Sequence, residues 1–154
     1  MITDPIERLI KRCRFTYGER HVATTGLCGT FALALYRHLK FYKYSPELYV
    51  YVETDYNGNY FWNDDGKALP NKEPNTYLKW RHVVVKVNNN FYDITGKIKN
   101  LQADIIDYID DYGIAIRISE SELFKELKEW RHNYSYGHFL NYSKRVKNKI
   151  TRIE

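Results

Sequence analysis

The sequence predicts an α+β fold, formed by a single domain over residues 1–154. Helices are predicted because capping signals open segments in which apolar residues recur at helical spacing. A sheet is predicted because 15 of the residues are tyrosines, and because runs of β-branched residues flank a turn of asparagines. With 28% charged and 44% hydrophobic residues, the chain has the composition of a globular protein rather than of a disordered one.

The first predicted helix begins after Asp4. Pro5 suits the first helical position, and Glu7 completes a capping box with Asp4. Gly18 is expected to end this helix. Cys13 recurs at helical spacing with the apolar residues before it, so it is expected to be a buried structural residue.

A second helix is predicted over residues 28–40, after a loop at residues 19–27. Its alanine and leucine content is typical of a central and largely buried helix. Cys28 stands at its beginning. The spacing of His38 from Cys28 places the two residues on different sides of the helix. We therefore expect His38 to pack against other residues or to face solvent rather than to partner Cys28.

Strands are predicted on both sides of a long polar segment. They cover residues 47–53, 80–87, 91–94 and 113–118. The second and third of them form a hairpin whose turn is centred on Asn89. The segment over residues 54–79 is rich in Asn, Asp, Gly and Pro, yet it contains aromatic residues such as Tyr60 and Tyr77. Two interpretations stay open: these aromatics wall a substrate cleft, or they pack beneath the loop.

Two shorter helices are predicted after the hairpin. The first covers residues 101–111, with Ile106 on its apolar face and its aspartates, including Asp104, on a solvated face. Ser119 and Glu122 form a capping box that opens the second.

Basic residues gather in a final predicted helix, about residues 139–154, in a chain whose net charge is +5. They are Lys144, Arg145, Lys147, Lys149 and Arg152. Such a cluster is expected to form a solvated face that aids solubility, and it can also attract an acidic partner or nucleic acid.

The chain has two cysteines, too few for a disulfide framework. Its first residues lack the pattern of a signal peptide, and no run approaches the roughly 18 apolar residues that a membrane span needs. We therefore expect a cytoplasmic protein with free thiols and no membrane span.

Three residues, Cys28, His82 and Asp93, together predict nucleophilic chemistry. At a helix N-terminus, unpaired N–H groups and the helix dipole stabilise a thiolate. A histidine can accept the thiol proton and later protonate the leaving group, and an aspartate can orient that histidine. A metal role is not expected, because the three residues lack a further clustered ligand.

Residues 26–35, 82–87 and 91–96, in this order, resemble the papain-like cysteine hydrolase superfamily, and most closely its transglutaminase-like or small bacterial and phage branch. The resemblance implies a central helix that starts at the nucleophile Cys28 and packs on an antiparallel sheet, with further C-terminal helices. It implies that His82 is the general base and acid and that Asp93 orients it. No cofactor is implied.

The resemblance also implies an oxyanion hole, for which the Cys28 backbone N–H is one donor. Papain has a glutamine shortly before its cysteine, and this chain has none. The second donor is therefore open among the Thr25 hydroxyl, a backbone N–H and a distant side chain such as Trp80 or Tyr77.

The expected function is a cysteine-dependent hydrolase or acyltransferase that acts on an amide bond through a Cys-His-Asp triad and an acyl-enzyme. Its partner would be a peptide or protein substrate, and the bond that of a peptide, an isopeptide or a glutamine side chain. The alternative is a catalytically inactive papain-like fold that binds nucleic acid or protein through its tyrosine-rich loop and basic C-terminus.

Overall fold

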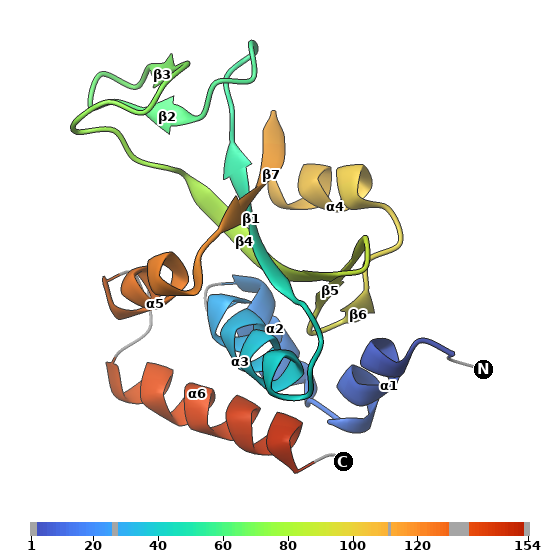
Figure 1. Cartoon of the computed structure of the whole chain (residues 1–154). Coiled ribbons are helices and arrows are strands. Elements are labelled where there is room, and N and C mark those ends of the chain that lie inside the picture. Colours follow the sequence, from blue (N-terminus) through green and yellow to red (C-terminus); the bar gives the residue numbers. More distant parts are fainter. Residues whose placement is uncertain (1–2, 26–27, 111, 130–135, 153–154) are drawn as a thin grey trace.

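The fold combines helices with an antiparallel sheet (Figure 1), which confirms the α+β prediction. This computed structural model describes residues 3–25, 28–110, 112–129 and 136–152. The helices are α1 (Pro5–Arg12), α2 (Tyr17–Thr25), α3 (Cys28–Phe41), α4 (Leu101–Tyr108), α5 (Glu120–Glu129) and α6 (Tyr136–Thr151). The strands are β1 (Glu47–Glu53), β2 (Phe61–Trp62), β3 (Ala68–Leu69), β4 (Trp80–Val87), β5 (Asn90–Asp93), β6 (Gly96–Lys97) and β7 (Gly113–Ile118).

The main sheet separates α4 from the other helices (Figure 1). Within the described chain its strand order is β6-β5-β4-β1-β7, and every neighbouring pair is antiparallel. Helix α3 packs against one face and is covered in turn by α2, α5 and α6, while α4 packs against the other face. Strands β2 and β3 pair with each other in the long connection between β1 and β4.

Strand β4 buries different side chains on its two faces. Val83 and Val85 join the core around α3, in which Leu35 is fully buried. Val84 joins a smaller core with Tyr51 of β1 and with α4. His82 is on this second side, beside Tyr51, because alternate residues of a strand share a face.

The hairpin between β4 and β5 forms as predicted, with a small change of register. Asn88 and Asn89 have φ angles of 50° and 68°, and Val87 pairs with Asn90. The turn is therefore centred between Asn88 and Asn89 rather than on Asn89. Asparagine tolerates this left-handed region, which a two-residue hairpin turn needs at both positions.

Helix α1 starts as predicted, but only one of the two hydrogen bonds of its capping box is formed. The Asp4 carboxylate accepts hydrogen bonds from the backbone N–H groups of Ile6 and Glu7. The Glu7 carboxylate instead accepts from the backbone N–H of Lys97, at 2.8 Å, and so ties α1 to β6. Cys13, just after the helix, is buried as expected.

The prediction of a helix that ends at Gly18, followed by a loop at residues 19–27, is wrong. Helix α1 already ends at Arg12, and α2 begins at Tyr17. A reciprocal capping box explains the new helix: the Glu19 N–H donates to the Thr16 hydroxyl at 3.1 Å, and the Thr16 N–H donates to the Glu19 carboxylate at 2.8 Å.

Helix α6 is less solvated than its charge predicts, and it begins earlier than residue 139. One side packs on α3 and buries Tyr142, Val146 and Ile150. Lys149, expected on a solvated face, forms an ion pair with the buried Glu19 of α2. The described residues include no helix that is both long enough and apolar enough to cross a membrane.

The burial of α3 predicts a large effect of Leu35→Ala on stability. Leu35 is 0% exposed, so its truncation leaves a cavity between the sheet and the outer helices. We expect the free energy of unfolding, measured with urea, to fall by about 3 kcal/mol. The exposed Lys40 of the same helix is the control, since Lys40→Ala should change it by less than about 0.5 kcal/mol. Equal effects of the two substitutions would contradict the central position of α3.

Candidate functional site

Cys28 is the first residue of α3, and the packing of the next residue fixes its position. A Cβ on Gly29 would lie 2.9 Å from a methyl carbon of Leu123 and 3.0 Å from one of Leu127. A side chain at this position would therefore push the Leu123 and Leu127 side chains aside, and glycine lets α5 pack closely on the first turn of α3 without that shift. Cys28 itself is half-buried, and both Cys13 and Cys28 are free.

His82 and Asp93 form a buried hydrogen-bonded pair. The His82 Nε2 and Asp93 Oδ2 atoms are 3.0 Å apart, and the two side chains are 1% and 5% exposed. The other oxygen of Asp93 accepts from the backbone N–H of Thr95 at 2.9 Å and from the Thr95 hydroxyl. The carboxylate is thus held at both oxygens, as an orienting group requires.

The structure also brings Cys28 to His82. The Cys28 thiol lies beside the imidazole ring of His82 and raises the pKa of that ring. Both residues line the same cleft. The second ring nitrogen of His82, Nδ1, has no hydrogen-bond partner in the described part of the chain. The predicted trio is therefore assembled in space, with Asp93 on one ring nitrogen and the other ring nitrogen unoccupied.

The charges of the pair favour a protonated histidine. Burial opposes a charged ring, but the hydrogen bond to Asp93 and the adjacent Cys28 sulfur raise the pKa of His82 to about 9. Burial also opposes a charged Asp93, yet the hydrogen bonds from His82 and Thr95 hold the pKa of this carboxyl below its usual range.

Helix α4 contributes two residues to the site that sequence reasoning missed. The ring of Tyr108 stacks on His82 with a centroid distance of 3.9 Å and an interplanar angle of 8°. Asp104 points inward and accepts a hydrogen bond from the Tyr51 hydroxyl at 2.5 Å, so its predicted solvated position is wrong. Ile106, predicted on the apolar face, is instead 60% exposed.

Helical spacing was the available signal for these two residues. Asp104 and Tyr108 fall in the same stripe as Leu101 and Ile105, at intervals of three and four residues.

Asp104 also changes the assessment of metal binding. His82, Asp93 and Asp104 offer ligand atoms that all lie within 4.8 Å of one another, so a further clustered carboxylate does exist. In the structure His82 Nε2 is bonded to Asp93, and Asp104 is bonded to Tyr51. A metal would have to replace both hydrogen bonds, and burial raises the pKa of Asp104, which disfavours the charged ligand. The cluster fits a hydrogen-bonded network better than a metal centre.

A cleft of about 970 Å³ opens onto Cys28 and His82. Aromatic side chains of the long connection and of β4 line it: Tyr60, Phe61, Tyr77 and Trp80. Of the two open interpretations of these aromatics, the structure favours the cleft wall for Tyr60, Phe61 and Tyr77.

The charged residues that line this cleft are mainly basic. They are Lys72, Arg81, Arg117 and Lys125, against Glu122 and Glu126. Arg81 pairs with Glu53 and Arg117 with Glu47, outside the cleft lining.

The oxyanion hole is described only in part. The Cys28 backbone N–H lies in the first turn of α3, whose N–H groups have no partner within that helix. Tyr77 and Trp80, two of the candidates for the second donor, line the cleft. The side chain of Thr25 and residues 26–27, which begin the stretch of the family resemblance, lie outside the described residues.

Comparison of the chain with known proteins finds no similar family, protein or structure. No family model matches the chain, and no significant match is found among curated proteins or solved structures. The interpretation of the site therefore depends on its geometry.

The raised pKa of His82 predicts a pH-dependent stability. Because the pKa is about 9 in the folded chain and 6.5 for an ordinary histidine, the folded state binds the proton more tightly than the unfolded state. The stabilisation is fully present below about pH 6.5 and is lost as the pH rises through about 9. Urea unfolding at a series of pH values measures it.

Two variants isolate the contribution of this histidine. His82→Gln should remove the loss of stability between these pH values, and His21→Gln, on the exposed side of α2, should keep it. If the free energy of unfolding of His82→Gln falls with pH as that of the wild type does, the loss of stability does not come from His82.

Proposed function

We propose that the protein is a cysteine-dependent hydrolase or acyltransferase that acts on an amide bond. One observation carries the proposal: Asp93 holds Nε2 of the buried His82, while Nδ1 lacks a partner among the described residues and the Cys28 thiol lies beside the ring. A nucleophile, a base and an orienting group need this arrangement.

The reaction follows from these positions. His82 holds the proton that the thiol has given up, and the Cys28 sulfur, as a thiolate, attacks the amide carbonyl carbon. The C–N bond then breaks, the protonated His82 gives its proton to the departing amine, and a thioester remains on Cys28. Water or a second amine attacks the thioester, His82 accepts its proton, and the regenerated thiol leaves the acyl group on the acceptor. The Cys28 backbone N–H would stabilise the oxyanion of each tetrahedral intermediate.

The arrangement of elements supports the papain-like, transglutaminase-like interpretation. Helix α3 starts at Cys28 and packs against the antiparallel sheet, whose strands β4 and β5 carry His82 and Asp93. The chain order Cys-His-Asp is that of the resemblance.

The cleft supports a peptide or protein substrate. Its volume of about 970 Å³ is at the upper end of the range for compact ligand sites, which suits several residues of an extended chain. Its aromatic wall can pack on such a chain, and its excess of basic residues favours acidic groups close to the reacting amide.

The proposal predicts selective alkylation of Cys28. Iodoacetamide at neutral pH should label Cys28, and it should spare Cys13, which is buried and whose pKa burial raises to about 11. His82→Ala should slow the labelling of Cys28 by about 100-fold, because the base that ionises the thiol is removed. Mass spectrometry of the digested protein measures both sites.

His38→Ala is the matched control, because His38 lies on the same helix and does not line the Cys28 cleft. It should leave the rate unchanged. Equal rates for wild type and His82→Ala would reject the activated nucleophile and favour the binding-module alternative.

The basic lining predicts a preference for anionic reagents. Lys72 and Lys125 have no direct ion-pair partner within the described ranges, so they supply the excess of positive charge over Glu122 and Glu126 in the cleft. The rate constant for iodoacetate divided by that for iodoacetamide should be larger for Cys28 than for a small free thiol. Added salt should reduce this difference. The ratio of the two rate constants is the measurement.

The double variant Lys72→Glu/Lys125→Glu should lower this ratio several-fold. Lys67→Glu/Lys144→Glu changes the net charge by the same amount at exposed positions outside the cleft, and should leave the ratio near the wild-type value. If both pairs lower it equally, net charge rather than the cleft lining determines the preference.

A further inference from the structure

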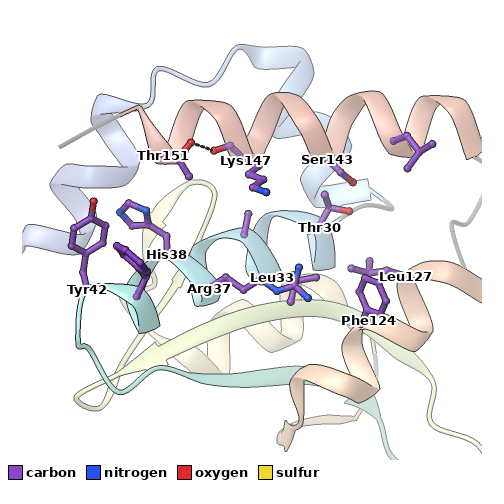
Figure 2. A pocket seen from close by; sticks show the side chains of 13 residues that line it. Thr30, Leu33, Arg37, His38, Tyr42, Phe124, Leu127, Ser143, Lys147 and Thr151 are labelled. Carbon is purple, nitrogen blue, oxygen red and sulfur yellow. Dashed lines mark hydrogen bonds between the residues drawn. The ribbon is translucent and has the colours of Figure 1, made fainter.

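A second hollow lies between α3, α5 and α6, where Figure 2 shows its lining side chains. Its volume is about 570 Å³, within the range of small-molecule sites. Leu33 and Ala34 of α3, Phe124 and Leu127 of α5 and Leu140 of α6 give it mainly apolar walls. It is separate from the Cys28 cleft, although Leu127 borders both.

A buried hydroxyl group in this groove lacks a partner. Thr30 is 5% exposed, lines the groove, and its Oγ1 makes no hydrogen bond to any described residue. Buried hydroxyl groups are normally paired, so an unpaired one indicates a place for a hydrogen-bonding atom of a ligand. Figure 2 shows Thr30 on α3 facing α6 near Ser143.

The charges around the groove are positive. Arg37 and Lys147 line it, and no acidic side chain does so among the described residues. Arg37 is held by Glu120 at 2.7 Å, whereas Lys147 has no ion-pair partner in the described ranges. Lys147 follows Ser143 by one turn of α6, and Figure 2 shows its side chain reaching from α6 toward α3.

We propose that this groove binds a carboxylic acid with an apolar chain, such as a fatty acid. The apolar chain packs on Leu33, Phe124 and Leu140, and the carboxylate lies at the boundary of α3 and α6. There it accepts a hydrogen bond from the Thr30 hydroxyl and pairs with the Lys147 ammonium group. An anion suits a groove that offers a donor and an unpaired cation but no acidic group.

Dodecanoate, kept below its micelle concentration, is the probe, and isothermal titration calorimetry on the full chain is the measurement. We expect saturable binding of one dodecanoate per chain, with a Kd at least tenfold lower than that of dodecanol, which has the same chain and no charge. Absence of saturable binding would overturn the proposal, and equal affinity of the two compounds would overturn the recognition of the carboxylate.

Variants locate the site. Lys147→Glu should weaken dodecanoate binding about tenfold, whereas Lys144→Glu, on the same helix but outside the groove, should change it little. Ala34→Phe should abolish binding by filling the groove, and its unfolding curve shows whether the variant is folded. Equal weakening by Lys147→Glu and Lys144→Glu would reject the site.

Two further variants separate the contributions of the hydroxyl and of the other cleft. Thr30→Val keeps the shape of the side chain and removes the donor, so it should weaken dodecanoate more than dodecanol. Cys28→Ser should leave dodecanoate binding unchanged, because the ligand occupies the groove and not the Cys28 cleft. Loss of binding in Cys28→Ser would place the ligand in the cleft and overturn the proposal.

Discussion

The burial of α3 is the constraint on which the other positions depend. The helix packs on the sheet with one side and is covered by α2, α5 and α6 on the others, so that Phe31, Leu35 and Leu39 are almost fully buried. A helix enclosed in this way cannot shift without opening several contacts. Its first residue, Cys28, is therefore held at a fixed place relative to β4, and the same packing creates the groove on its far side.

Burying the His82–Asp93 pair has a free-energy cost, and the groups around the pair offset it. Burial of two ionisable groups is unfavourable unless their hydrogen-bonding atoms are satisfied. Thr95 supplies donors to Asp93, and Tyr108 covers the face of the imidazole ring. Within the His82–Asp93 pair, Nδ1 of His82 is the atom that lacks a hydrogen-bond partner among the described residues. This nitrogen is the one that the proposed reaction uses.

Chain order and local patterns were sufficient to predict the helix at Cys28, the hairpin and the proximity of His82 to Asp93. Helix α2 was missed although its capping box, Thr16 and Glu19, is present in the sequence, because the residues after it lack an apolar stripe. The inward position of Asp104 was hidden by its acidic neighbours on α4. The Glu19–Lys149 pair joins residues 130 positions apart, and no local pattern encodes such a contact.

Two long-range contacts, of Glu7 with β6 and of Glu19 with Lys149, have a consequence for synthesis on the ribosome. Glu7 cannot meet β6 before residue 97 has been made, and Glu19 cannot meet Lys149 until almost the whole described chain has emerged. The strands that carry His82 and Asp93 are complete well before then. The nascent chain must therefore keep the outer apolar side of α3 uncovered while its reactive residues are already available to assemble, and it is in this interval that it most needs protection from aggregation.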